Sequence, residues 1–256
     1  MKNNSQDLHF IELPNGLKFY ATDPKQLGSA RFLINEIFYK KFYERAGFEL
    51  KASDTVVDIG GNMGLFAMWA STQVGQGCVL SIEPTSNCFA TIIENISRNE
   101  LKNIIPLQIA LGAEEGTLEL IEYPGFNAVT HAAHLKPAAW GQFFIKLLYR
   151  KYSEPPNRLE VPCQTLEKVI NEHELQIIDL LKIDCEGAEY DILLSTSDEV
   201  LKRAKRIVME FHELDRNHSH HELVDRLQSV GFEVTLKKPW FDHWFLKTGT
   251  IWATRL

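Results

Sequence analysis

Short apolar segments typical of buried strands alternate with amphipathic segments typical of helices along most of the chain. Because parallel strands need long crossover connections, this alternation predicts an α/β fold in which helices sandwich a mostly parallel sheet. Eight segments have strand character, and in chain order they read VVDI, CVLSIEP, IIPLQIALG, GTLELIEY, IIDLLKID, AKRIVMEF, FEVTLKK and GTIWATRL. The last two are expected to pair as a hairpin. Ligands of such sheets bind beyond the carboxyl ends of the strands, so residues that follow a strand are candidate site residues.

Helical periodicity predicts six helices between these strands, at residues 30–46, at 65–72, after Thr85 or Ser86 as N-cap, and at 164–173, 188–195 and 220–231. The third of these helices is expected to bury one face, formed by Phe89, Ile92, Ile93 and Ile96. Residues 123–160 hold four of the ten prolines and no clean period, so we read them as an insertion or lid with some helix in 140–152. The expected organisation is a helical lead-in or cap at 1–46 and one larger domain at 47–256.

Composition and charge exclude several classes of protein. A chain of 256 residues can bury one large core or at most two small ones. We expect no membrane partner, because no run of about 18 apolar residues exists and the N-terminus lacks the apolar core of a signal peptide. The net charge of -7 argues against nucleic-acid binding by phosphate neutralisation. The four cysteines lack CxxC spacing, so they are read as reduced thiols of a cytoplasmic protein.

The first strand runs into a glycine-rich loop with the spacing Asp58-x-Gly60-Gly61-Asn62-x-Gly64. This spacing departs from the dinucleotide fingerprint G-x-G-x-x-G, because Asn62 stands in place of the second glycine and Gly64 comes one residue early. The acid ahead of the glycines suits a ligand that carries an ammonium group rather than a phosphate. The alternative is that the glycines only make a tight turn.

Glu83 ends the second strand, where its carboxylate can accept hydrogen bonds from both hydroxyls of a ribose. An amine, a carboxylate and a ribose together describe S-adenosylmethionine (SAM). The predicted SAM-binding residues around the two strand ends are Asp58, Gly60, Gly61, Asn62, Gly64 and Glu83.

A second unusual stretch, LLKIDCEGAEYDILL, places Asp184, Glu186 and Glu189 at the end of another strand. Carboxylates this close repel one another unless a cation or a shared proton lies between them. Lys182 shares a strand face with Asp184. The alternative role for Asp184 or Glu186 is to cap the following helix, and the two roles are compatible.

The next strand, IVMEFH, ends with Glu210 and His212 on one face, and parallel pairing would bring Glu210 to the same rim as Asp184. His212 can take a proton from a substrate hydroxyl, because the unperturbed pKa of histidine lies near working pH. Asp184, Glu210 and His212 could also hold a divalent cation. We favour a general base over a metal and predict no metal ligand, because the sequence shows no tight ligand spacing.

The other histidines have weaker functional signals. His218, His220 and His221 are expected to lie in a solvated loop and helix start that Ser219 caps, and His131 and His134 lie in the presumed lid.

These segments resemble the FkbM-type methyltransferases, a family within the class I SAM-dependent superfamily. The matching segments are VVDIGGNMGLF, SIEP, IALGAEEGTLEL, LLKIDCEGAEYDIL and IVMEFH, and INEIFYKKFYERAGF looks like the lead-in of members associated with natural-product assembly. The resemblance covers most of the chain and implies a Rossmann-like, mostly parallel seven-stranded sheet with an antiparallel C-terminal hairpin. It also implies that Gln108 to Ala110 flank the adenine of SAM. The family usually has alanine in place of Gly61, so that exchange is expected to be tolerated.

The resulting hypothesis is SAM-dependent O-methylation of a hydroxyl on a small natural product or sugar. The candidate catalytic side chains are Asp184, Glu186, Glu210 and His212, with Asp184, Glu186 or His212 as the base. The alternatives are N-methylation of a peptide or amide nitrogen, a nicotinamide-dependent oxidoreductase, and a non-catalytic binding protein on the same fold. Aromatic residues at 240, 241 and 244, with His243, suggest a contact between two copies in a homodimer.

Overall fold

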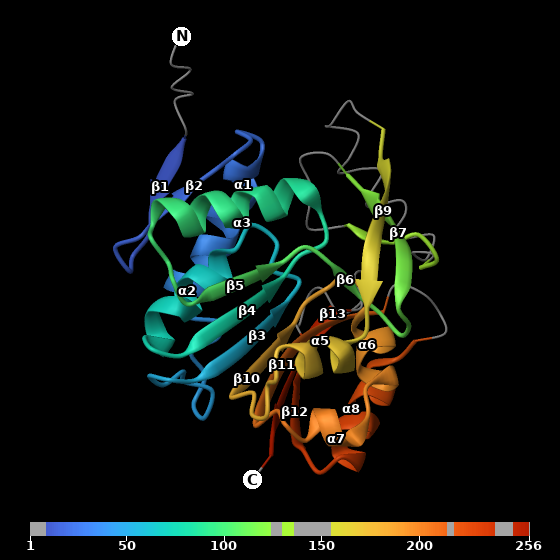
Figure 1. Cartoon of the computed structure of the whole chain (residues 1–256). Helices are drawn as coiled ribbons and strands as arrows, with labels where there is room; N and C mark the ends of the chain where they lie inside the picture. Colours follow the sequence, from blue (N-terminus) through green and yellow to red (C-terminus); the bar gives the residue numbers. More distant parts are fainter. Residues whose placement is uncertain (1–8, 124–129, 136–154, 214–217, 239–247, 256) are drawn as a thin grey trace.

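The computed structural model describes residues 9–123, 130–135, 155–213, 218–238 and 248–255. Its main sheet has seven strands in the order β12-β13-β11-β10-β3-β4-β5 (Figure 1). These strands are β3 (Thr55–Ile59), β4 (Cys78–Ile82), β5 (Ile104–Leu107), β10 (Leu180–Ile183), β11 (Arg206–His212), β12 (Glu233–Lys237) and β13 (Thr248–Thr254).

Five neighbouring strands of this sheet, from β11 to β5, are parallel, and β13 is antiparallel to both β11 and β12. The predicted α/β fold with a mostly parallel seven-stranded sheet and an antiparallel C-terminal hairpin is therefore confirmed. From β3 the chain moves outward through β4 to β5, and it later returns to the other side of β3 as β10 and β11. The order thus reverses between β3 and β10, which is where ligands of open α/β sheets bind.

Helices cover both faces of the sheet. Two large apolar clusters lie on either side, one under α1, α2 and α3 and the other under α5, α6 and α8 (Figure 1). The helices are α1 (Gln26–Ile34), α2 (Leu65–Val74), α3 (Ser86–Arg98), α5 (Leu166–Glu172), α6 (Glu189–Ser195), α7 (Asp198–Leu201) and α8 (His220–Ser229), and the π-helix η1 (Asn35–Tyr39) extends α1. Among the described residues, no helix combines the length and apolarity needed to cross a membrane.

The predicted buried face of α3 is partly wrong. Ile92 is buried as expected, but Ile93 is 43% exposed. Polar Thr91 and Asn95 are buried instead. The reason is that this face of α3 meets backbone groups of the N-terminal hairpin, which need hydrogen-bond partners.

That hairpin consists of β1 (Phe10–Glu12) and β2 (Lys18–Tyr20), and α3 supplies the neighbour that β2 lacks on its outer edge. The side chain of Asn95 accepts a hydrogen bond from the amide of Tyr20 at 2.8 Å and donates one to its carbonyl at 2.9 Å. Asn99, one turn later, makes the same pair of bonds to Lys18 at 2.9 and 2.8 Å. The two asparagine side chains thus make the hydrogen bonds to β2 that the backbone of a neighbouring strand would make.

A second sheet of four strands, in the order β6-β9-β7-β8, stands beside the carboxyl ends of the main sheet (Figure 1). Its strands are β6 (Ala110–Leu111), β7 (Gly116–Glu122), β8 (His131–Ala132) and β9 (Asn157–Gln164). The sequence predicts IIPLQIALG as one strand, but it divides between β5 and β6 in different sheets. The sequence did not predict β9. The predicted helix at 140–152 lies outside the described residues.

Candidate active site

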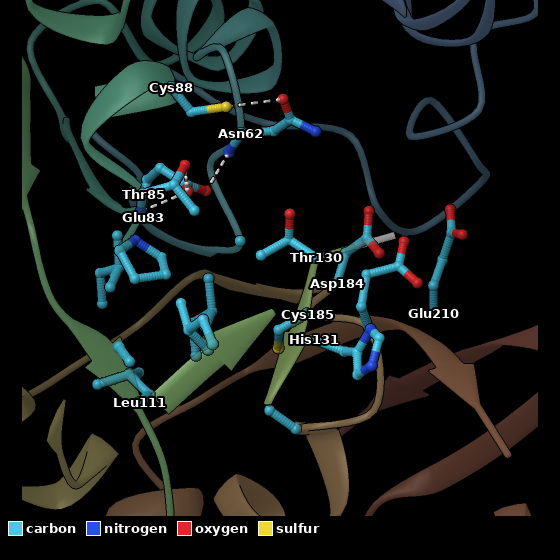
Figure 2. A pocket seen from close by; sticks show the side chains of 18 of the residues that line it. Asn62, Glu83, Thr85, Cys88, Leu111, Thr130, His131, Asp184, Cys185 and Glu210 are labelled. Atoms are coloured by element: carbon cyan, nitrogen blue, oxygen red, sulfur yellow. Dashed lines mark hydrogen bonds between the residues drawn. The ribbon is translucent and has the colours of Figure 1, made fainter. Parts of the chain in front are cut away.

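A pocket opens at the carboxyl ends of the parallel strands, at the point where the strand order reverses (Figure 2). The turns after β3 and β4 form one side, and the residues that follow β10, with Glu210 of β11, form the other. The small sheet closes it with residues such as Leu118, Leu120 and Ala132, and α1 with η1 adds Leu33, Glu36 and Ile37. Four of the predicted SAM-binding residues line this pocket, namely Gly60, Asn62, Glu83 and Ala110.

The glycine loop is packed directly against the turn that follows β10. Gly60 has a φ of +78°, and a Cβ atom there would lie 1.8 Å from the backbone oxygen of Asp184. Only glycine fits this approach. At Gly61 a Cβ atom would lie 2.5 Å from the hydroxyl oxygen of Ser81. An alanine at that position therefore requires Ser81 to rotate, so the exchange that the family resemblance suggests carries a cost in this chain.

Asp58 lies behind the glycine loop and is not among the residues that line the pocket. It is fully buried, and its carboxylate is 2.9 Å from the ammonium of Lys182, while Ser81 donates a hydrogen bond to it at 3.0 Å. The three residues are direct neighbours on β10, β3 and β4. Burial alone would lower the pKa of Lys182, but Asp58, with its charge and its hydrogen bond, and Asp184 together outweigh burial and raise it. In this structure, the ammonium group beside Asp58 is that of Lys182.

Lys182 also joins the two halves of the site. Its ammonium donates a hydrogen bond to the carbonyl of Gly60 at 2.8 Å and lies 3.9 Å from Asp184. Strand alternation predicts that Lys182 shares a face with Asp184, but it does not predict the contact with Asp58 on the neighbouring strand. A lysine inside the apolar strand LLKI was the available signal, because a lysine is almost never fully buried without a partner.

Glu83 is a buried carboxylate at the edge of the pocket (Figure 2). One oxygen accepts a hydrogen bond from the amide of Asn62 at 2.9 Å, and the other accepts from the amide and hydroxyl of Thr85 at 2.9 and 2.6 Å. Burial raises the pKa of Glu83 in spite of these bonds. A carboxylate has about four acceptor positions, so one remains for a ligand hydroxyl. Thr85 occupies the predicted N-cap position of α3, but its hydroxyl donates a hydrogen bond to Glu83 and does not cap the helix.

Asp184, Glu186 and Glu210 line the opposite side of the pocket. Burial raises the pKa of Glu186 to about 8, although nearby His212 favours its charged form. Burial, reinforced by the charge of Asp184, also raises the pKa of Glu210. Glu186 has a φ of +50°, a left-handed conformation that is uncommon for residues other than glycine and that clusters at functional sites.

Glu189 lies beneath this acidic side and forms hydrogen bonds that hold the turn after β10. It is fully buried, and it accepts hydrogen bonds from the amides of Cys185 at 3.0 Å and Gly187 at 2.8 Å. The prediction that Asp184 or Glu186 caps α6 is therefore wrong, because Glu189 bonds the free amides of the turn. Glu189 also lies 2.9 Å from Nδ1 of His212. Burial alone would lower the pKa of His212, but Glu186 and Glu189 outweigh it and raise the pKa well above the ordinary value of 6.5.

The remaining predicted residues lie farther from the pocket or outside the described residues. Gln108 donates a hydrogen bond to Ser86 and does not line the pocket, and neither do Gly61 and Gly64. Ser219 caps α8 as predicted, but His220 is buried against Glu213 instead of solvated. The aromatic residues at 240–244 lie outside the described residues.

Three lining residues carried no signal in the sequence, and a fourth, His131, was expected in the lid with only a weak functional signal. Tyr43, Cys88, Thr130 and His131 all line the pocket. The hydroxyl oxygen of Thr130 is buried without a hydrogen-bond partner among the described residues.

The strand order, the glycine loop and the carboxylate at the end of β4 define a class I methyltransferase. The profile of the methyltransferase FkbM domain family matches residues 58–234, well over half of the chain. The chain belongs to this family, and it is a SAM-dependent methyltransferase.

Individual relatives agree with this assignment. The chain is 28% identical to Methyltransferase 1 of Beauveria bassiana, over 90% of this chain and 91% of that protein. It is 27% identical to the 31-O-demethyl-FK506 methyltransferase FkbM of Streptomyces tacrolimicus, over 89% of this chain and 90% of that protein. The methyltransferase domain of METTL16 has a similar fold, with a TM-score of 0.50 and 13% identity over 96% of this chain and 86% of that one.

Proposed function

We propose that this protein transfers the methyl group of SAM to a hydroxyl group of a small natural product or a sugar. The observation that carries the proposal is the acidic side of the pocket, which is lined by Asp184, Glu186 and Glu210. Methyl transfer to oxygen needs correct positioning of the reactants and, in addition, the removal of a proton from the hydroxyl. The name of the FkbM relative, which describes methylation of a 31-O-demethyl compound, favours oxygen as the acceptor atom.

The residues present fit SAM on the side of the pocket near β3 and β4. The close approach at Gly60 leaves no room for a side chain there, and Glu83 retains one acceptor position for a ribose hydroxyl. Gly60, Asn62, Glu83 and Ala110 would hold SAM. When bound, SAM supplies an activated methyl group on a sulfonium. Asp58 would act through the loop, because it holds Lys182 and thereby the carbonyl of Gly60.

Glu186 is the base that we favour among Asp184, Glu186 and His212. Asp184 lies 3.9 Å from the ammonium of Lys182, so a cation already lies beside its carboxylate. His212 does not line the pocket. Glu186 lines the pocket, and its side chain has His212 beside it at 3.8 Å.

The first test is the replacement Glu186→Gln. The expected result is a fall in kcat of roughly 10²–10⁴-fold, because a positioned base contributes about this much. Calorimetry with S-adenosylhomocysteine should show unchanged affinity, since Glu186 lies across the pocket from Glu83. The control Glu160→Gln removes an exposed carboxylate of β9 and should leave turnover unchanged. Full turnover in Glu186→Gln would show that Glu186 is not the base and would leave Asp184 or His212 as the candidate.

The acceptor atom is identified with SAM that carries a ¹³C-labelled methyl group. Incubation with secondary alcohols of macrolide type, with sugars and with peptide amides, followed by ¹³C NMR, separates O-methyl from N-methyl products. Labelled N-methyl product alone would replace the proposal with amide methylation. S-adenosylhomocysteine binding without transfer to any hydroxyl or amide would refute both.

A further inference from the structure

Three side chains of the type that ligate metals gather where β10 and β11 end. Glu210 and His212 are two residues apart on β11 and share one face, and Asp184 directly follows the neighbouring strand β10. One ligand atom from each of the three residues lies within 4.8 Å of the other two. Figure 2 shows the carboxylates of Asp184 and Glu210 near each other, across the pocket from Glu83. Atoms at this spacing can share one ion after small side-chain adjustments.

The orientation of His212 is an independent observation that points to a ligand. Its side chain is only 10% exposed, and Nδ1 is held 2.9 Å from the carboxylate of Glu189. Because that carboxylate also accepts two backbone amides, it is an acceptor, so Nδ1 carries the proton. Nε2 makes no hydrogen bond to any described residue, and the nearest acid, Glu186, is 3.8 Å away. A buried carboxylate on one ring nitrogen, with no hydrogen bond from the described residues on the other, is the arrangement that orients metal-binding histidines. A bound ion would replace the proton that the nearby carboxylates favour on Nε2.

The balance of charge around the cluster also favours a cation. Asp184, Glu186 and Glu210 line the same side of the pocket, and Glu189 lies beneath them. Among the described residues, Lys182 is the permanent cation within 4 Å of Asp184, and it is already engaged by Asp58 at 2.9 Å and by a backbone carbonyl. Half-buried carboxylates that outnumber their cations repel one another. A divalent ion would relieve this repulsion.

We propose that Asp184, Glu210 and His212 bind a divalent cation, with Glu189 as the residue that orients His212. Two carboxylates and one imidazole form a mixed oxygen and nitrogen set, which suits first-row ions such as Mn²⁺ better than Ca²⁺. The sequence favoured a base over a metal at this rim, and the cluster together with the carboxylate that holds Nδ1 of His212 reverses that preference. A cation here would face the acceptor and favour the ionised form of its hydroxyl. Only this last use rests on the proposed function, because binding of the ion needs no acceptor.

The test measures Mn²⁺ binding directly on the full chain after EDTA treatment and dialysis, with neither SAM nor acceptor present. Electron paramagnetic resonance reports free Mn²⁺, so a titration gives affinity and stoichiometry. The expected result is one ion per chain, together with a Mn²⁺-dependent rise in Tm. Glu210→Gln and His212→Gln should each weaken binding by at least about tenfold, and Glu189→Gln by roughly 10–100-fold, as for residues that orient metal ligands.

The controls keep the result independent of folding and of methyl transfer. Circular dichroism confirms that each variant is folded, and Glu210→Gln, which replaces a half-buried side chain with one of equal size, serves if the buried variants fail to fold. Glu160→Gln, on the exposed face of β9, should bind Mn²⁺ like the unmodified protein. The proposal is overturned if Mn²⁺, Zn²⁺ and Mg²⁺ all fail to bind at one ion per chain, or if Glu210→Gln binds as tightly as the unmodified protein.

Discussion

Gly60 and Gly61 are adjacent in one loop, but a side chain would meet different obstacles at the two positions. At Gly60 the obstacle is a backbone carbonyl, and the φ of +78° adds strain, so Gly60→Ala should lower the free energy of unfolding by at least about 2 kcal/mol. At Gly61 the obstacle is the hydroxyl of Ser81, which can rotate at the expense of its hydrogen bond to Asp58. Gly61→Ala should therefore cost only ~1 kcal/mol.

A double-mutant cycle in urea checks the explanation for Gly61. Once Ser81→Ala has removed the hydroxyl, Gly61→Ala should add little further cost, because the obstacle and its hydrogen bond are already gone. Strictly additive effects of Gly61→Ala and Ser81→Ala would show that the close contact with Ser81 does not decide the cost.

The junction between β2 and α3 depends on amide side chains of the helix, and its strength should vary with burial. Asn95→Ala leaves the backbone amide and carbonyl of Tyr20 without partners in a half-buried place, so we expect a loss of ~1–3 kcal/mol and faster hydrogen exchange at Tyr20. Asn99→Ala is the matched control. It breaks the same pair of bonds to exposed Lys18, where water can replace them, so its cost should be smaller. An equal or larger cost for Asn99→Ala would contradict this account.

How well individual elements could be predicted depends on how local their signals are. The strands of the main sheet and α8 with its Ser219 cap follow from apolar runs and capping residues that the sequence displays. The strand β9 alternates buried and exposed residues but contains Pro162, and proline demotes a strand in sequence reading. The division of IIPLQIALG between β5 and β6 depends on pairing with β9, far along the chain.

The same distinction applies to the candidate site. Gly60, Glu83 and Asp184 were found because each follows a recognisable strand. The pairing of Asp58 with Lys182 was missed because it depends on the register between β3 and β10, which are separated by more than a hundred residues. The orientation of His212 was missed for a similar reason, since it comes from Glu189 on another element.

Across the whole molecule, the polar groups lie at both ends of the parallel strands, and those at the amino ends stabilise the fold. Asp179 accepts hydrogen bonds from Lys205 at 2.6 Å and from the amide of Thr55 at 2.9 Å, and it therefore connects β3, β10 and β11. Burial alone would raise the pKa of Asp179, but these two donors outweigh burial and lower it.

Because the folded-state pKa of Asp179 is lowered, its contribution to stability is complete above the unfolded pKa of about 3.9 and is lost as the pH falls through the folded pKa. Asp179→Asn should therefore lower the free energy of unfolding by ~1 kcal/mol at pH 7, and the difference should shrink below about pH 4. Urea titrations at both pH values check this. Asp225→Asn, which removes an exposed carboxylate of α8, should change stability by less than about 0.5 kcal/mol. A difference for Asp179→Asn that persists unchanged at low pH would rule out this charge as its origin.

The family profile begins at Asp58, yet Leu33, Glu36, Ile37 and Tyr43 of the preceding stretch form part of the pocket wall. One wall of the pocket is thus built by a stretch that the family profile does not cover. A chimaera that imports this stretch from a relative would keep Gly60, Glu83 and the sheet untouched. Such an exchange would alter that wall of the pocket and leave the turns after β3 and β4 as they are.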